Sequence, residues 1–490
     1  MSRAWRIAGA VLFAWAACAA PALATLQQRL MEEAGIDPVA IGSLPSIRLE
    51  GLGGMHLGIL DEGNELNAHD FGGSVSGVLE DADGWTIDGW GGSDRLALEQ
   101  GPHSFERGFG HSGLQVIKRA PRRALGLDAN WSFWDAPNAA WTEGKVSGPR
   151  ISALLNQQIG RFTLGGAVGL ESEEERRDVE DFFAIQHKQD RVVGQLGGQV
   201  RLDELMTGLQ AGATWDFDRG DIEGKSEDPA RFHQDDYTWS SPGDRFSVFL
   251  LMRGTGALEG GVRASYLSRD GSERVLVSWS DRSPRNPSRT NYRDEAVTFW
   301  EKGSDWQAST CWRWHMNSAT ILGFEAGFRQ FEHEVEEGIN YKGSLRAGRT
   351  ERKTFSAGFG ASRLLLQDRL LAAAEAHGIL GTRQWDDDGT PLEADERDVQ
   401  AAIGLEYFAA RSVVLRGAVY SGTEDEDVDA PLSMNKVSGV SAGASWLPRG
   451  GTIQFHAALR YERISRDAPE ALSLEKGNGL GYSIGMRLLP

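Results

Sequence analysis

The side chains that could carry out chemistry are scattered along this chain instead of being grouped in recognised motifs. Ten histidines occur, and none has a His-x-His or His-Glu-x-x-His spacing. The two cysteines, Cys18 and Cys311, lie far apart in the sequence. Zinc sites and disulfide scaffolds need closely spaced ligands or several cysteine pairs, so we expect neither of them. We also expect no cofactor.

Two weaker candidates for chemistry remain. The first is an acidic stretch that resembles a short calcium loop, although it lacks the full EF-hand spacing and a solvated loop is the simpler interpretation. The second is His456, which could activate a serine nucleophile as in barrel lipases, but no sequence feature marks that serine. We therefore expect no enzyme and no firm metal site, and the weak metal candidates are Asp216, Asp218, Asp221 and Glu223.

The elements that would position these residues follow from a strict alternation of apolar and polar residues. In residues 398–408, Val399 and Leu405 belong to an apolar face, whereas Asp398 and Glu406 belong to a polar one. Successive side chains of a strand point to opposite faces, so this alternation predicts a strand. About seventeen further segments show the same period, and they are about 10–13 residues long, which suits a tilted strand that crosses a membrane.

Loop lengths, aromatic residues and polar faces favour an outer-membrane barrel over a soluble sandwich. Short links of a few residues alternate with long ones near 171–190, 218–243, 268–304, 332–350, 382–396, 422–436 and 465–477. Short turns on one side and long loops on the other are typical of such barrels. We predict an all-β, transmembrane, antiparallel up-and-down barrel of about 18 strands, within a range of 16–20 because 268–304 could hold one more hairpin.

The polar faces of the predicted strands would line the lumen of this barrel. Their charges are close to balance, and a barrel of about 16–18 strands leaves an aqueous channel unless it is plugged. In a narrower barrel the same residues would pair as a packed polar core. The expected lumen residues are Arg161, Arg201, Arg263, Arg329, Arg416, Arg460, Arg487, Asp128, Glu171, Asp216, Glu259, Glu325, Asp398, Glu406 and Glu462.

The N-terminal part consists of a targeting signal and a segment in which apolar and polar residues do not alternate. Arg3 and Arg6 precede an apolar run over 7–20, and Ala22-Leu23-Ala24 is a small-x-small cleavage site. We expect residues 1–24 to be a secretory signal peptide that is cleaved after Ala24. Residues 25–83 would plug the lumen as a hatch or lie in the periplasm, and residues 84–490 would form the barrel.

Composition supports an exported barrel. The chain has 490 residues, 61 glycines and a formal net charge of −19, which gives no reason to expect a nucleic-acid partner. No interior run of 18 apolar residues occurs, which argues against a membrane protein built from helices.

Two stretches resemble known outer-membrane proteins. Ser483, Gly485 and Leu488 match the C-terminal assembly signal of bacterial outer-membrane barrels, with Pro490 where an aromatic residue usually stands. The resemblance implies recognition by the barrel assembly machinery of a Gram-negative cell. Residues 51–54 and 70–73, both rich in glycine, faintly resemble the N-terminal region of FadL- and PorV-like barrels. That resemblance implies a hatch and the passage of hydrophobic solutes.

We therefore expect a porin-like outer-membrane pore or passive transporter for small solutes, which diffuse through a polar lumen. The first alternative is a non-conducting structural or surface-binding barrel whose acidic loops bind divalent cations. A lipid hydrolase embedded in the barrel is the third. The expected partners are outer-membrane lipid, the assembly machinery and divalent cations on the loops, without nucleic acid.

Overall fold

The computed structural model describes most of the region predicted to form the barrel and a few residues before it. The predicted signal peptide lies outside the described residues, and of 25–83 only Leu52, Ser76, Gly77 and Asp83 are described. The described residues are 52, 76–77, 83–100, 103–136, 141–179, 183–228, 233–240, 242–253, 257–282, 290–336, 348–387, 390–428, 430–448, 452–467 and 475–488.

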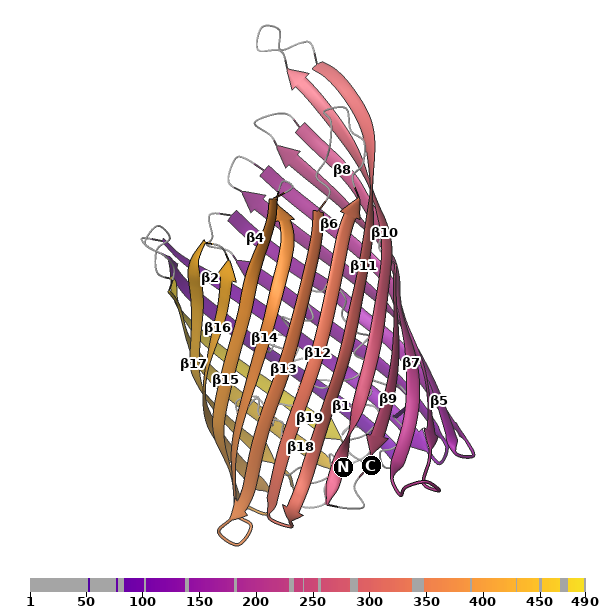
Figure 1. Ribbon diagram of the computed structural model, residues 1–490, viewed down its shortest axis with the longest axis vertical. Coiled ribbons are helices and arrows are strands. Elements are labelled where there is room, and N and C mark those ends of the chain that lie inside the picture. The colour runs from indigo at the N-terminus through magenta and orange to yellow at the C-terminus, as the bar shows by residue number, and fades with distance from the viewer. Residues whose placement is uncertain are drawn as a thin grey trace, which may run out of the picture.

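These residues form one antiparallel sheet that closes on itself (Figure 1). Strands that follow one another in the chain pair, except that β8 and β9 each pair with β7 and β10, and β1 also pairs with β19, which closes the barrel. The strands are β1 (Gly84–Gln100), β2 (His103–Ala120), β3 (Arg123–Ala136), β4 (Trp141–Ile159), β5 (Phe162–Val179), β6 (Phe183–Arg201), β7 (Leu209–Asp228), β8 (His233–Ser240), β9 (Gly243–Met252), β10 (Leu258–Arg282), β11 (Thr290–Asn317), β12 (Thr320–Glu336), β13 (Gly348–Leu365), β14 (Leu370–Asp387), β15 (Thr390–Ala410), β16 (Val413–Val428), β17 (Ala430–Trp446), β18 (Ile453–Asp467) and β19 (Glu475–Leu488).

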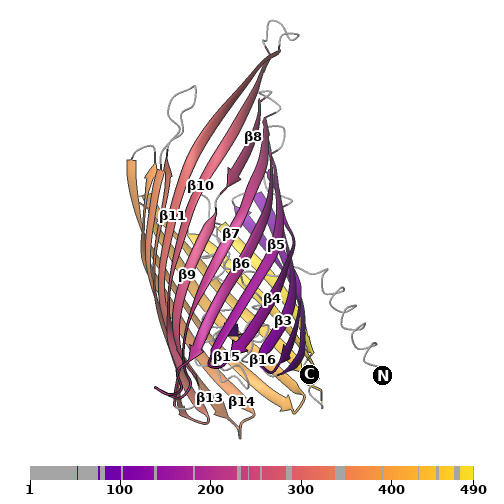
Figure 2. The ribbon, with the colours of Figure 1, turned by 90° about the vertical axis from the view of Figure 1, so that its right-hand side faces the viewer.

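The segments β8 and β9 occupy one position in the wall, between β7 and β10 (Figure 2). Asp221 pairs with Ser240 and Asp218 with Gly243, so the register on β7 does not shift across the break. Pro242 lies in this break, and proline has no backbone N–H to give to a ladder. The wall therefore has eighteen strands, which confirms the predicted fold class.

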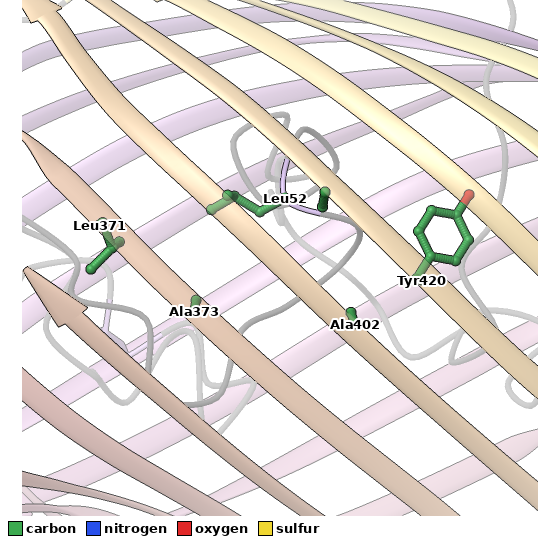
Figure 3. Close-up of a cluster of buried hydrophobic side chains, with 6 residues drawn as sticks. Leu52, Leu371, Ala373, Ala402 and Tyr420 are labelled. Carbon is green, nitrogen blue, oxygen red and sulfur yellow. The ribbon is translucent and has the colours of Figure 1, made fainter.

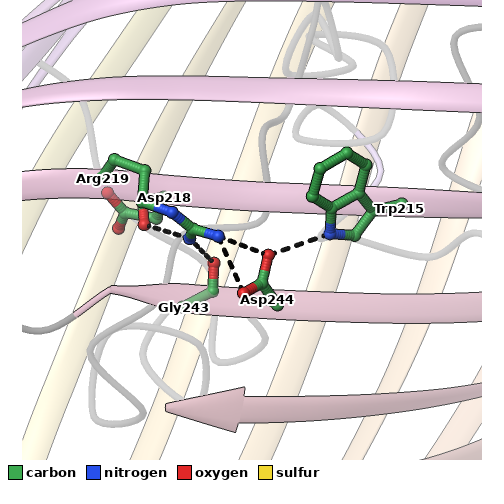
Figure 4. A network of polar contacts seen from close by, with 5 residues as sticks. All are labelled: Trp215, Asp218, Arg219, Gly243 and Asp244. Atoms are coloured by element: carbon green, nitrogen blue, oxygen red, sulfur yellow. Dashed lines mark hydrogen bonds and ion pairs between the residues drawn. The ribbon is translucent and has the colours of Figure 1, made fainter. Parts of the chain in front are cut away.

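Next to this break, a polar network on the outer side of the wall joins β7 to β9 (Figure 4). Arg219 on β7 donates to both carboxylate oxygens of Asp244 on β9, at 2.7 and 2.8 Å. Trp215 Nε1 donates to the same carboxylate at 2.9 Å. The Arg219 guanidinium also donates to the backbone carbonyl of Gly243 at 2.8 Å. These bonds join β7 to β9 where the ladder is interrupted.

Several strands continue well past their predicted ends, and this corrects the predicted loop lengths. β10 and β11 reach 25 and 28 residues, and their hairpin rises above the rest of the wall (Figure 1). The extra hairpin considered within 268–304 is the upper part of these two strands, where Val275 pairs with Val297. The alternation fades there because both faces of a strand meet water outside a bilayer, whereas the backbone pairing continues.

The two faces of the wall differ in character. Large apolar side chains cover the outer face, among them Ile403 and Leu405, which are 61% and 49% exposed. Glu406, the next residue on the same strand, is 1% exposed and faces inward. Aromatic rings also stack on this face, Trp446 on Phe455 near the short turns and Trp215 on Phe246 farther from them. An apolar outer band between aromatic rings suits a lipid bilayer. No helix among the described residues is long and apolar enough to cross a membrane.

Candidate functional site

The candidate site is the inner face of the wall, where charged side chains form ion pairs across neighbouring strands. Glu406 on β15 lies directly opposite Arg416 on β16, and Arg416 Nε donates to Glu406 Oε2 at 2.6 Å. Arg329 Nε lies 3.0 Å from Asp305 Oδ1, and that carboxylate is 1% exposed. A buried carboxylate is tolerated only when a cation and hydrogen bonds compensate its lost hydration. These ion pairs therefore line the lumen and also stabilise the contacts between neighbouring strands of the wall.

Most of the predicted lumen residues lie on this inner face. The strand register aligns each of them with buried polar residues on the adjacent strands, which identify the inner face. Arg487 pairs with Asp88 at 2.8 Å and closes the lining between β19 and β1. Glu171 pairs with Arg191 at 3.2 Å. The other predicted residues that the register places on the inner face are Arg263, Arg329, Arg416, Arg460, Asp128, Asp216, Glu259, Glu325, Asp398, Glu406 and Glu462.

Arg161 and Arg201 lie at the short-turn edge of the wall, and Arg201 alone belongs to a strand. Arg161 lies in the turn between β4 and β5, where its guanidinium is 3.6 Å from Glu204 and both side chains are exposed. Arg201 is the last residue of β6, and its backbone N–H donates to the Arg161 carbonyl at 3.1 Å. At Arg161 the alternation was extended one residue too far, because β5 begins at Phe162. Arg201 lies opposite Gln210 of β7, which is 4% exposed, so the register places Arg201 on the inner face, at the exposed end of its strand.

The sequence pattern also missed several lumen charges, although a usable signal was present. Arg191 lies opposite Gly220 and Arg313 lies opposite Gly323 on a neighbouring strand. A long side chain that folds against the wall needs a small partner across the ladder, and glycine provides that space. The missed residues include Asp88, Asp94, Arg119, Arg191, Arg245, Asp305, Arg313, Arg352, Glu375 and Glu396.

The histidine that was a candidate base has a serine neighbour in the structure. Ser445 Oγ lies 2.6 Å from His456 Nδ1, and Arg416 Nη1 donates to the same hydroxyl at 2.5 Å. Ser445 is 2% exposed, so the network is packed into the wall. A second histidine, His377, lies between the carboxylates of Glu325 and Glu375. Both histidines therefore belong to the polar lining.

The weak metal candidates do not form one site. Asp216 and Asp218 are on the inner face of β7, where both are buried, whereas Asp221 and Glu223 are exposed on the other face. Residues at odd and even positions of a strand point to opposite faces, so these four carboxylates cannot converge on one ion. Within the described ranges, no group of three or more His, Cys, Asp or Glu residues is arranged to hold a metal ion.

Described residues of the N-terminal segment lie inside the barrel. Leu52 is fully buried against Leu371, Ala373, Ala402 and Tyr420, on the inner face of β14, β15 and β16 (Figure 3). This cluster is an apolar patch in a lining that is otherwise rich in charge. We call it the Leu52 pocket, which comprises Leu371, Ala373, Ala402, Ala418 and Tyr420.

A second contact lies about half-way round the wall from the Leu52 pocket. Ser76 Oγ donates to Gln199 Oε1 on β6 at 3.2 Å, and Asn156 Nδ2 on β4 donates to the Ser76 carbonyl at 2.9 Å. Asn156 and Gln199 lie close to the short turns, as Leu371 does on its own strand. Leu52 and Ser76, both before β1 in the chain, thus contact opposite sides of the wall near the short turns.

No protein-family profile and no curated protein matches the sequence. Among solved structures, the chain is similar to the "CymD monoaromatic hydrocarbon channel", with 12% identity, 92% of this chain and 98% of that chain covered, and a TM-score of 0.35. It is similar to the toluene transporter TodX of P. putida, with 10% identity, coverage of 90% and 97%, and a TM-score of 0.35. For the copper transporter OprC the identity is 10%, the coverage 83% and 81%, and the TM-score 0.45.

Proposed function

We propose that this protein is a pore or passive transporter of the bacterial outer membrane, through which small solutes diffuse along a polar lumen. The observation that carries the proposal is the contrast between the two faces of a closed wall of eighteen strands. The outer face exposes Leu405 and its equivalents, whereas the inner face carries ion pairs such as Glu406 with Arg416. A barrel of this size encloses an aqueous channel unless something fills it.

The segment before β1 is the element that narrows this channel in our proposal. Leu52 on one wall and Ser76 on the opposite wall are both completely buried near the short-turn end of the lumen. Residues 25–83 then act as a hatch and not as a periplasmic leader. The chain's own residues at the two walls hold the hatch, with an apolar contact on one side and hydrogen bonds on the other.

Single-channel recording in planar bilayers tests this function. We expect small, brief currents from the full mature chain and larger, longer ones after deletion of residues 25–81, because the barrel strands all lie later. Heat-modifiable gel mobility shows that each protein is a folded barrel. Electrical silence of both proteins, with intact barrels, would reject the pore and favour a structural barrel.

The first alternative is a non-conducting barrel whose acidic loops bind cations, and some of the acidic residues assigned to those loops lie in strands instead. The acidic stretches near 171–179 and 424–428 belong to β5 and β16, so their carboxylates alternate between two faces. Glu171 is also paired with Arg191 in the lumen. Cation binding to the outer ends of these strands stays a proposal, and Mg²⁺ would raise the melting temperature above that of a Na⁺ control at equal ionic strength.

The contact between Ser445 and His456 is the observation that favours a lipid hydrolase. Because Ser445 is 2% exposed and also bonded to Arg416, we expect no labelling by a fluorophosphonate probe. Labelling that Ser445→Ala abolishes would support the hydrolase instead.

Recognition by the barrel assembly machinery rests on the C-terminal strand. In β19, Ser483 and Gly485 face the lumen, whereas Leu488 pairs with Ile87 of β1 and Ile453 of β18. We propose that this strand is the assembly signal despite Pro490.

A further inference from the structure

Two arginines and one carboxylate meet on the inner face of β7, β9 and β10. Arg245 on β9 lies directly opposite Asp216 on β7, and Arg263 follows on the next strand, β10. Asp216 interacts electrostatically with both guanidinium groups. Its Oδ1 also accepts a hydrogen bond from Gln195 Nε2 at 2.6 Å. Asp216 therefore interacts with two arginines and also accepts a hydrogen bond from a glutamine.

Arg263 is the least compensated member of this group. Its Nη2 donates to Ser247 Oγ at 3.2 Å, but its buried Nε has no hydrogen-bond partner among the described residues. The charged neighbours that act on it are Asp216 and a second cation, Arg245. Arg416, by contrast, donates to both Glu406 and a serine hydroxyl. A guanidinium has five N–H donors, and leaving them without acceptors away from water is costly.

The residues directly across the ladder from Arg263 are a small serine and a phenylalanine. Ser309 lies directly opposite Arg263 on β11 and is exposed. On the other side, Phe249 faces Arg263 across the ladder, but its ring packs over Gly212 of β7, where a Cβ atom would lie 2.2 Å from Cζ. The ring thus leans away from Arg263. The serine hydroxyls nearby are further hydrogen-bond donors, which suits an acceptor-rich ligand.

From this geometry we infer a binding site for a compact anionic group, centred on Arg263 and completed by Arg245 and Ser247. Guanidinium groups bind carboxylate, phosphate and sulfate oxygens with charge-assisted and often bidentate hydrogen bonds. A bound anion accepts hydrogen bonds from the accessible N–H groups of Arg263, which is only partly buried, and adds negative charge beside two arginines. This inference rests on the proposed pore function and names the solutes that the pore retains: small molecules with a phosphate, sulfate or carboxylate group.

Isothermal titration of the purified full chain with inorganic phosphate, at fixed ionic strength in chloride, tests the site. We expect saturable binding that Arg263→Gln weakens about tenfold or more, and that Arg263→Lys restores in part. Asp216→Asn should tighten binding, because it removes the competing negative charge while its amide oxygen still accepts from Gln195. Arg460→Gln, which changes a lumen arginine on another part of the wall, is the matched control and should leave phosphate binding unchanged.

The outcomes separate this site from the pore. Absence of saturable phosphate binding, equal affinity of the wild type and Arg263→Gln, or weaker binding by Asp216→Asn would each overturn the anion site. Phosphate binding by a barrel that passes no current would uphold the site and reject the pore. Current through a barrel that binds no phosphate would uphold the pore and reject the anion site. Heat-modifiable mobility confirms that each variant is folded before titration.

Discussion

The contact between Leu52 and the inner wall gives a sharp test of how the lumen is closed. Leu52→Ala removes a fully buried side chain from the Leu52 pocket. Leucine-to-alanine changes at buried sites cost about 2–5 kcal/mol, and every 1.4 kcal/mol is about a factor of ten in an equilibrium. Taking about 3 kcal/mol, the ratio of undocked to docked hatch should rise about 100-fold. Longer open times in single-channel records would show it.

Two comparisons make this prediction specific. Leu366→Ala alters an exposed leucine in the turn between β13 and β14, and it should leave the open times unchanged. Ala402→Leu, which fills the Leu52 pocket from the wall side, should lengthen them as Leu52→Ala does. If Leu52→Ala leaves both conductance and dwell times at wild-type values, the contact does not hold the hatch, and our reasoning about closure is wrong.

Three further predictions concern the wall. Leu405→Arg should prevent barrel formation while Gln400→Arg is tolerated, because an arginine in the middle of the bilayer costs about 2–4 kcal/mol on the lipid face. Gel mobility with and without heating shows whether each variant forms a barrel, and equal tolerance of both changes would reject the assigned faces. Arg416→Ala should destabilise the barrel by about 3–5 kcal/mol in denaturant titration, since it leaves Glu406 buried without a cation, whereas Arg416→Met with Glu406→Gln should recover most of that loss. Reversal potentials in salt gradients should show little preference between small cations and anions, and a strong cation preference would contradict a balanced lumen.

The sequence was sufficient to predict the barrel because each membrane-crossing strand must keep one apolar face. That constraint acts on every second residue, as in 398–408, and it gave the correct number of strands. Outside the bilayer the constraint disappears, so the upper halves of β10 and β11 could not be told from loops. The break at Pro242 is visible as a proline, but the register across it depends on both neighbouring strands.

The lining was harder to predict than the wall. The alternation within each strand placed Glu406 and Arg416 on the inner face. Their pairing, however, depends on the register between β15 and β16, and the sequence of one strand does not determine that register. Arg161 was misplaced because a turn ends the alternation without a change in composition. The burial of Leu52 and Ser76 joins residues that are far apart in the chain and follows no local pattern.

The central claim is that solutes pass through the lumen of this barrel, and cysteine accessibility during current recording tests it most directly. In a chain with Cys311→Ser, we introduce Gln400→Cys on the inner face, outside the Leu52 pocket, or Val399→Cys on the outer face, where the native valine is 55% exposed. A charged, water-soluble thiol reagent should reduce the current through the Gln400→Cys barrel and leave the Val399→Cys barrel unaffected. Equal effects at the two positions, or none at Gln400→Cys while the reagent is shown to have reacted, would contradict a conducting lumen.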